Sequence, residues 1–394
     1  MASVLETEYV GRRRPLFRLA LVSSLLTVLT LGIYRFWMKT RLRRFYWSSI
    51  RPGGQPLEYV GEPMEKLLGF LIAVVFLAFY IGIVNLLLMF VSFSFFNTNL
   101  WAYALSFVGI VPIIFYARYR ARRYILARTR WRGIRFGMDQ GAWSYAWRAL
   151  VHWLVTILSL GLLWPRMTFW LEKYRTDRTW FGSEKMQQGG RWQMLYRPYL
   201  VFLAGLVTVA IGGVVTFQGN VVAGGGLIVF GVLLTGYGLV HYRVHAFRLM
   251  TNTKNIGGIG FRSRPRPWRV LRVYSMGYGL AVLAIVALLT GLGVLFYMAI
   301  LGGQPVGEDV DLTLIGDNVP WWVNTVFAMV TYFSLFILWG VLTHVLVTLP
   351  LARHYAETLE ITAPAGLSGI KQRHRDDMEH AEGFAEALDV GAAI

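Results

Sequence analysis

Long runs of hydrophobic residues dominate this chain of 394 residues, and arginine-rich polar segments separate them. A helix needs about 20 apolar residues to cross the hydrocarbon core of a membrane. Six runs are close enough to this length to be full spans: 67–95, 100–116, 199–217, 221–240, 276–301 and 321–349. They show no two-residue alternation, so they are not typical of a transmembrane β-barrel. The pattern predicts an all-α polytopic membrane protein, a bundle of six full transmembrane helices.

Two further apolar segments, Leu16–Tyr34 and Ala149–Trp164, could also span by length, which would give eight crossing helices. If both crossed, 16 of the 39 basic residues would face the outside, in the stretches 35–66 and 118–148. If neither crosses, every lysine and arginine faces the cytoplasm. The positive-inside bias favours the second arrangement. We therefore expect two re-entrant or interfacial segments on the cytoplasmic side and both termini in the cytoplasm.

Composition supports the membrane class, because only 15% of the residues are charged against about 25% in a soluble domain. The net charge of +18 is interpreted as attraction to the bilayer, above all to anionic lipids. No basic region forms a separate domain, so nucleic acid is not an expected partner. The chain has no cysteine, which excludes disulfides and thiolate metal sites. Its N-terminus does not resemble a cleaved signal peptide.

One apolar phrase occurs twice, as TVLTLGIYRFWM at 27–38 and as TILSLGLLWPRM at 156–167, 129 residues later. In each segment, polar residues recur at helical spacing and give the apolar helix a polar stripe. The two stripes align as Ser23, Thr27 and Thr30 with His152, Thr156 and Ser159. Unsatisfied polar groups are costly in lipid, so we interpret these six residues as a candidate polar seam shared by the two stripes. Alternatively, the hydroxyls join spanning helices.

The repeated phrase indicates a duplication, and a repeat of this kind determines the fold. The predicted divisions are a cytoplasmic N-terminus (1–14), repeat 1 (15–137), repeat 2 (146–262), a final helical hairpin (276–349) and a cytoplasmic C-terminal tail (350–394). Each repeat has an apolar segment, two spans and a basic cap. In the second phrase LGLLWPRM lacks the tyrosine of the first, and the cap after it is diluted to EKYRTDRTWFGSEK.

The basic caps share a hydroxyl residue at the end of a helix, then a polar turn, a glycine and a short alternating stretch. The pairs are Ser49 with Gly53, Thr129 with Gly133, Thr253 with Gly257 and Thr362 with Gly366. Glycine permits the positive φ with which a chain leaves a helix. The alternating residues after it predict short strands or turns.

Several of these stretches resemble a known family. TLGIYRFWMKTRLRRFYW followed by GQPLEYVG, the recurring RRY…T…G caps, and EGFAEALDVGA near the C-terminus are similar to the YjgN-like family of bacterial inner-membrane proteins. The resemblance covers nearly the whole chain and implies a multi-pass location in the bacterial inner membrane. It implies no activity.

Candidate chemistry is sparse, because none of the six predicted spans contains an acidic residue. His241 and His245 have the i, i+4 spacing of metal ligands, but arginines surround them and no carboxylate is near in sequence. We therefore predict no enzyme, no metal site and no cofactor. Asn85, Asn324 and His344 are candidate midplane polar residues, which either line a substrate path or hydrogen-bond between helices.

Two functions fit this sequence. The first is an uncoupled transporter or channel for a small solute or lipid, since repeated hairpins with broken apolar segments are typical of transporters. The second is a non-catalytic membrane organiser that binds anionic lipid or a protein partner through its arginine and aromatic caps. The candidate lipid contacts are Arg41, Arg43, Arg44, Arg118, Arg120, Arg122 and Arg123. The sequence identifies no substrate, no particular partner and no oligomeric state.

Overall fold

The computed structural model describes residues 4–96, 100–301 and 320–373. The C-terminal motif EGFAEALDVGA and most of the acidic connection at 302–320 lie outside these residues. The chain forms two compact units. The first comprises Met1–Val10, Arg43–Val270 and Arg353–Ile394, and the second comprises Gly11–Leu42 and Leu271–Ala352. The two units interleave along the sequence, unlike the consecutive repeats that the sequence predicts.

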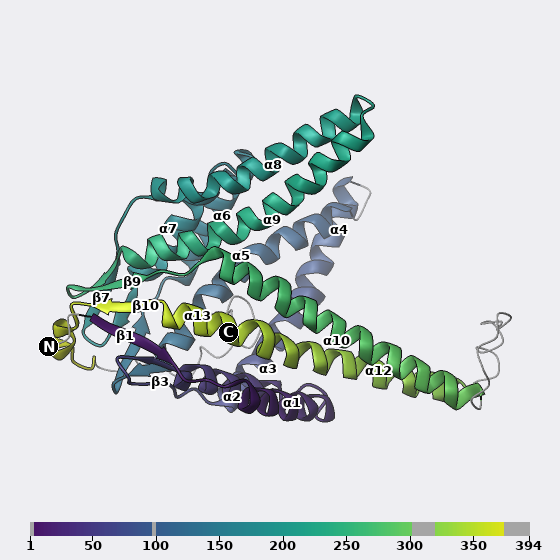
Figure 1. Ribbon diagram of the computed structural model, residues 1–394, viewed down its shortest axis with the longest axis horizontal. Coiled ribbons are helices and arrows are strands. Elements are labelled where there is room, and N and C mark those ends of the chain that lie inside the picture. The colour runs from purple at the N-terminus through teal and green to yellow at the C-terminus, as the bar shows by residue number, and fades with distance from the viewer. Residues whose placement is uncertain (1–3, 97–99, 302–319, 374–394) are drawn as a thin grey trace. The chain divides into compact units, whose positions relative to one another are not determined.

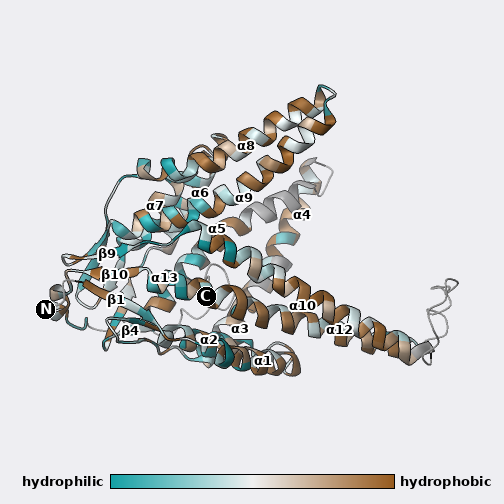
Figure 2. Cartoon of the chain, viewed as in Figure 1, coloured by the Kyte–Doolittle hydropathy of each residue, from teal (hydrophilic) through white to brown (hydrophobic). Residues whose placement is uncertain are grey.

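The first unit holds most of the helices. They are α3 (Pro63–Phe79), η1 (Tyr80–Val84), α4 (Asn85–Phe96), α5 (Leu100–Ala127), α6 (Ala142–Leu158), α7 (Trp164–Thr176), η2 (Trp192–Leu195), α8 (Tyr196–Phe217), α9 (Val221–Asn252) and η4 (Pro364–Gly369). Helices α8 and α9 lie side by side (Figure 1). Their apolar surface lies away from the strands, and hydrophilic residues gather where α7 and α9 approach the strands (Figure 2).

The second unit is built around α1 (Arg13–Leu29), α10 (Pro267–Leu301) and α12 (Trp321–Leu342), with η3 (Thr343–Thr348) continuing α12. Helix α2 (Arg35–Ser49), helix α13 (Leu349–Glu357) and helix α10, whose first turn belongs to the first unit, each have residues in both units. Stacked rings join α10 to α12, with Phe296 and Phe327 at 4.0 Å between centroids. Aromatic stacking of this kind adds to the burial of apolar surface between two helices.

Four helices in the described residues are long and apolar enough to cross a membrane: Trp192–Phe217, Val221–Asn252, Pro267–Ala299 and Trp321–Glu357. They correspond to the last four predicted spans. The predicted span 67–95 is divided among α3, the π-helix η1 and α4, and the predicted span 100–116 lies within α5. The number of six full spans stays a prediction.

The all-α class is wrong in one respect, because the first unit also contains a ten-stranded antiparallel sheet of order β2-β1-β10-β9-β8-β7-β6-β5-β4-β3. The strands are β1 (Val4–Tyr9), β2 (Ile50–Pro52), β3 (Leu57–Tyr59), β4 (Thr129–Trp131), β5 (Ile134–Met138), β6 (Thr179–Phe181), β7 (Glu184–Gln188), β8 (Lys254–Ile256), β9 (Ile259–Ser263) and β10 (Leu359–Thr362). Strands of three to six residues are too short for their alternation to stand out.

The sheet is nearly closed, because its end strands β2 and β3 are consecutive in the chain and contact each other. One hydrophobic cluster fills it: Trp131, Phe181, Ile256, Ile259, Ile361, Leu367 and Ile370. Residues 350–373, predicted as part of a cytoplasmic tail, therefore contribute α13, β10 and η4 to the folded structure. Beyond η4 the chain still contacts the sheet, where Ser183 N donates to Lys371 O at 2.8 Å.

Five helix-to-strand junctions share one contact, in which a hydroxyl at the helix end donates to the carbonyl four residues earlier. The donors are Ser49, Thr129, Thr179, Thr253 and Thr358. The cap that looks diluted in sequence thus has Thr179 as its hydroxyl residue, with Gly182 three residues later instead of four, and the last junction has Thr358 where the sequence suggested Thr362. These likenesses support internal repetition, although duplication itself stays a prediction.

Glycines bring α8 and α9 into close contact, as expected for packed membrane helices. A Cβ atom at Gly231 would lie 2.7 Å from Val209 N, and one at Gly238 would lie 2.6 Å from the Cα of Phe202. By contrast, Gly236 faces open space. The close contact therefore involves only one face of α9.

Candidate functional site: a basic cleft around Glu172

A cleft of about 770 Å³ lies within the first unit, between α5, α6, α7, α9 and the start of β8. Its cationic side chains are Arg118, Arg122, Arg175, Arg243 and Lys254. Its aromatic side chains are Phe115, Tyr145, Trp153, Trp164, Tyr242 and Phe247. Of the described residues that line it, only Glu172 is acidic and none is a histidine. We call this feature the basic cleft.

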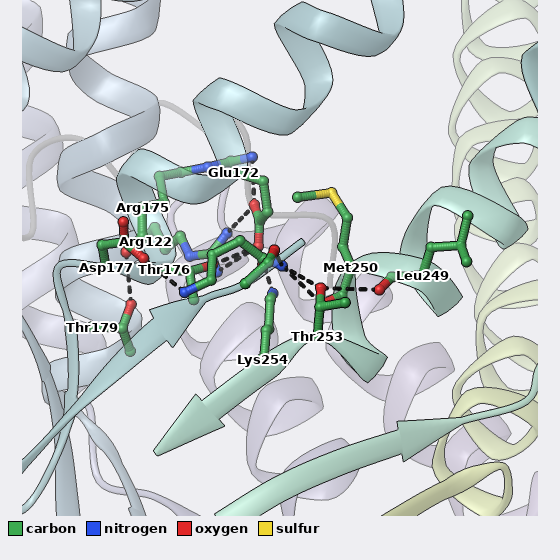
Figure 3. Close-up of polar contacts among 12 residues, drawn as sticks. Arg122, Glu172, Arg175, Thr176, Asp177, Thr179, Leu249, Met250, Thr253 and Lys254 are labelled. Atoms are coloured by element: carbon green, nitrogen blue, oxygen red, sulfur yellow. Dashed lines mark hydrogen bonds and ion pairs between the residues drawn. The ribbon is translucent and has the colours of Figure 1, made fainter. Parts of the chain in front are cut away.

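Glu172 binds three cations that come from three different elements (Figure 3). Arg122 of α5 approaches with both terminal nitrogens, at 3.2 Å to Oε2 and 3.4 Å to Oε1. Arg175, one turn further along α7, places Nη2 at 2.7 Å from Oε2. Lys254, the first residue of β8, places Nζ at 2.8 Å from Oε1. One carboxylate therefore joins a helix of the predicted first repeat to a helix and a strand of the second.

The charge state of Glu172 follows from these contacts. Burial alone would raise the pKa of this carboxyl, since it favours the neutral form. The positive charges of Arg122, Lys254 and Arg175 outweigh burial and hold the pKa of Glu172 well below its usual range. Glu172 is therefore ionised at neutral pH, and its side chain is only 17% exposed.

A second set of hydrogen bonds positions Lys254. The buried Gln188 of β7 donates from Nε2 to Met250 O at 3.0 Å and to Thr253 Oγ1 at 2.8 Å. The backbone nitrogen of Gln188 donates to Asp177 Oδ1 at 2.7 Å, which ties β7 to the end of α7. These bonds fix the end of α9, and hence the lysine that follows it, beside Glu172.

This arrangement favours binding of an anion over acid–base chemistry. The single carboxylate of the cleft is fully engaged by three cations, and no described lining residue is a histidine that could exchange a proton near neutral pH. The cations outnumber the carboxylate, and aromatic walls continue from them. The cleft is thus amphipathic, because cationic and aromatic side chains line it together.

Two of the seven predicted lipid-contact arginines line the cleft, namely Arg118 and Arg122. Two others are buried and hold the protein together. Arg43 Nη1 donates to the hydroxyl of Tyr59 at 3.3 Å, and Arg123 Nε donates to Met138 O at 2.9 Å. A buried arginine in such a contact is not available to a lipid phosphate.

The three remaining arginines lie outside the cleft. Arg44 Nη2 donates to Gly61 O at 3.0 Å, and Arg120 Nη1 donates to the hydroxyl of Tyr116 at 2.9 Å. Arg41 is exposed, and its guanidinium carbon lies 5.5 Å from the centre of the Tyr34 ring. This distance is suited to a cation–π contact.

The two polar stripes lie in matching helical hairpins, α1/α2 and α6/α7. Thr27 Oγ1 donates to Ser23 O at 2.7 Å, and Thr156 Oγ1 donates to His152 O, also at 2.7 Å. Thr30 and Ser159 make equivalent hydrogen bonds in the turns of the two hairpins. The Thr30 hydroxyl accepts from Tyr34 N at 2.9 Å, and the Ser159 hydroxyl accepts from Leu163 N at 3.1 Å. The hydroxyls of Thr27, Thr30, Thr156 and Ser159 are thus satisfied within their own hairpins, whereas Ser23 Oγ is buried and bonds to no described residue. The shared seam stays a prediction.

The predicted midplane residues have different surroundings. Asn324 is exposed in the first turn of α12, and therefore lies at the N-terminal end of this helix and not in its middle. Asn85 directly follows the π-helix η1, and His344 lies inside the π-helix η3. Two of the three therefore coincide with irregular turns of long apolar helices.

The sequence missed Glu172, its partners Arg175 and Lys254, and the cleft residue Arg243. Glu172 stands 50 residues from Arg122 and 82 residues from Lys254, so no local spacing links them. The one available signal is that this acid stands next to a basic run on a short helix, EKYRTDR.

The metal and cofactor predictions concern absences. No group of three or more His, Asp or Glu in the described part of the chain could hold a metal ion.

Neither a curated protein nor a solved structure matches the chain. The profile described as a bacterial protein of unknown function, DUF898, matches residues 4–285. The resemblance seen in the sequence is thereby confirmed, and the chain belongs to this YjgN-like family of bacterial proteins of unknown function.

Proposed function

We propose that this protein is a non-catalytic membrane protein of the bacterial inner membrane that binds an anionic lipid headgroup in the basic cleft. The observation that carries the proposal is the excess of five cations over one carboxylate in a cleft with aromatic walls. Arginine suits phosphate because its planar group donates two parallel hydrogen bonds. The aromatic side chains of the cleft suit the glycerol and upper acyl region of the same molecule.

The position of the cleft along α9, relative to the thickness of a membrane, supports a lipid ligand. Helix α9 has 32 residues, a length of about 48 Å at 1.5 Å per residue. The hydrocarbon core is only about 30 Å thick, so one end of α9 extends into the headgroup region. The cleft residues of α9, from Tyr242 to Thr251, belong to its last three turns. The basic run before β8 makes this the end that lies among headgroups.

The proposed topology keeps this end on the cytoplasmic side. We propose six full spans, two apolar hairpins that do not cross, and both termini in the cytoplasm. The positive-inside bias supports this arrangement, as does the basic character of the helix ends that meet the sheet. Single cysteines at Arg41 and Arg130 should react only with reagents that reach the cytoplasm. Labelling from the periplasm would refute the six-span topology.

Lipid binding is tested with the purified protein in nanodiscs or detergent. Replacing both Arg118 and Arg243 by glutamine removes two positive charges and leaves the contacts of Glu172 intact. Native mass spectrometry should then show fewer retained phosphatidylglycerol molecules, with retained phosphatidylcholine unchanged. The exposed Arg262 on β9, which does not line the cleft, gives a matched control when replaced by glutamine. Equal phosphatidylglycerol retention in the double variant and the wild type would refute the proposal.

A second candidate function is uncoupled transport of a small solute or lipid. The observation in its favour is that η1 and η3 interrupt long apolar helices beside Asn85 and at His344. π-Helical turns are rare and frequent at functional sites, and broken helices mark substrate sites in transporters. Proteoliposomes containing a fluorescent phosphatidylglycerol should lose more than half of their fluorescence to dithionite if the protein moves lipid between leaflets. A loss equal to that of empty liposomes would exclude lipid movement.

A further inference from the structure

The turn between α6 and α7 presents large apolar side chains at its tip. Leu160 is 90% exposed and Leu158 is 74% exposed. Leu160 has a positive φ of 51° and is followed by Gly161, which also has a positive φ. A bulky leucine rarely adopts this conformation, so the turn holds an apolar side chain outward at a backbone position that disfavours it. In water, such a tip would be an aggregation hazard.

The backbone of this turn is hydrogen-bonded as a lipid environment requires. Gly161 N donates to Thr156 O at 2.8 Å, and Trp164 N donates to Gly161 O at 3.0 Å. The hydroxyl of Tyr199 donates to the same Gly161 carbonyl at 2.9 Å. The hydroxyl of Tyr196 donates to Leu162 O, also at 2.9 Å. An exposed turn in water would not need tyrosines for its carbonyls, because water would bond to them.

The two tyrosines place the turn relative to a candidate span. Both belong to the first four residues of α8 (Tyr196–Phe217), within the apolar helix Trp192–Phe217. Tyrosine and tryptophan gather where a span meets the membrane surface. Trp192 packs edge-on against Tyr196 at 5.5 Å between ring centres. The turn therefore lies at the level where α8 enters the membrane.

We propose that the tip of the α6/α7 hairpin inserts into the hydrocarbon of the cytoplasmic leaflet. The occupant of its apolar surface is the acyl region of the bilayer, because the turn lies beside the first turn of the apolar helix α8, whose tyrosines bond its Gly161 and Leu162 carbonyls. The inference rests on the proposed topology, in which this hairpin does not cross.

Insertion would give the basic cleft an entrance from the side of the lipid. Trp164 begins α7 directly after the turn, and its ring lies 6.3 Å from that of Trp153, which also lines the cleft. Glu172 stands eight residues further along α7, about 12 Å from Trp164 at the rise of an α-helix. A lipid could thus keep its chains at the inserted tip while its phosphate reaches the cations.

The experiment uses the absence of cysteine from the chain. Leu160→Cys is labelled with the polarity-sensitive fluorophore NBD in the full-length protein in nanodiscs, and Leu158→Cys repeats the measurement in case one variant does not fold. The matched control is Gln187→Cys, at an exposed position on β7. NBD at the tip should emit at shorter wavelength than NBD at the control, be quenched by nitroxide on lipid acyl chains, and resist iodide in water.

Two outcomes would overturn the inference. Quenching of the tip label by iodide but not by acyl-chain nitroxide would place it in water. Protection from both quenchers would mean that protein covers the tip, either this chain or a second copy. Neither outcome affects lipid retention by the cleft or cysteine labelling at Arg130, so failure of the inference is distinguishable from failure of the proposed function.

Discussion

Replacing Glu172 by glutamine should have opposite effects on stability and on anion binding. The substitution leaves Arg122, Arg175 and Lys254 close together without their common counter-ion. Removing one partner of a buried ion pair costs roughly 3–5 kcal/mol. Arg122 is 34% exposed and Arg175 is 29% exposed, so solvent screens part of the loss. We expect the free energy of unfolding to fall by about 2–3 kcal/mol.

The same substitution should strengthen binding of an anionic headgroup. Glu172 neutralises part of the positive charge of the cleft, and glutamine would leave that charge available to a ligand. We expect phosphatidylglycerol to bind roughly fivefold more tightly, which corresponds to about 1 kcal/mol. Unfolding in SDS measures stability, and titration of the lipid into protein in neutral detergent measures affinity. Glu184→Gln on β7 is the control, because Glu184 makes no ion pair among the described residues.

Two results would refute this reasoning. If both variants are equally stable, the three cations do not depend on Glu172. If Glu172→Gln binds phosphatidylglycerol more weakly than the wild type, Glu172 helps to hold the ligand and does not compete with it.

The pH dependence of the wild type supplies an independent check. The pKa of Glu172 is depressed in the folded protein, whereas an unfolded glutamate titrates near pH 4.3. Its contribution is therefore complete above about pH 4.3 and is lost as the pH falls through the folded-state pKa. The stability difference between wild type and Glu172→Gln should be constant from about pH 8 to 5 and shrink only below about pH 4. A difference that shrinks between pH 8 and 6 would contradict the ionised state assigned to Glu172.

Three further predictions follow from packing and hydrogen bonds. Gly231→Leu should lower the free energy of unfolding in SDS by about 2 kcal/mol or more, because the new side chain would overpack the contact between α8 and α9. Gly236 faces open space, so Gly236→Leu should leave the free energy of unfolding unchanged. Equal effects of the two substitutions would contradict this packing. Tyr199→Phe should remove one of the two hydrogen bonds to the Gly161 carbonyl and lower the free energy of unfolding by about 1 kcal/mol. An unchanged unfolding curve would place water at the turn. The losses of stability caused by Thr27→Val and by Thr156→Val should be additive within about 0.5 kcal/mol in the double variant, because each hydroxyl bonds inside its own hairpin. A larger coupling energy would support the shared polar seam.

The apolar helices and the family could be predicted from the sequence because their signals are local or continuous. Four of the predicted spans appear as helices long enough to cross a membrane, since a run of about 20 apolar residues has few other uses. The repeated phrase lies in two hairpins, α1/α2 and α6/α7, which share a positive φ at Leu31 and at Leu160. A glycine follows each of these leucines and also has a positive φ.

The sheet could not be predicted with the same ease. A strand such as β4 has three residues, which gives one alternation and no distinct period. Its partner on one side is β3, separated from it along the chain by α3, η1, α4 and α5. Pairing over such a distance leaves no local mark, although the pairs that begin with Ser49, Thr129 and Thr253 did indicate where strands begin and turn.

The missed sheet is also the reason that the basic cleft was missed. Strands β5, β6, β7 and β8 are neighbours in the sheet in the same order as in the chain. Helix α5 leads into β4 and β5, α7 into β6 and β7, and α9 into β8, so neighbouring strands gather the ends of these three helices. Those ends carry Arg122, then Glu172 with Arg175, and finally Lys254. In the sequence alone, these residues belong to separate basic segments, which indicate only a non-specific attraction to anionic lipid. The sheet brings these cations together into one positive site, in which Glu172 is the single acidic residue among the described lining residues. Replacing Glu172 therefore distinguishes its structural role, which is to hold the cations together, from its effect on the binding of an anionic ligand.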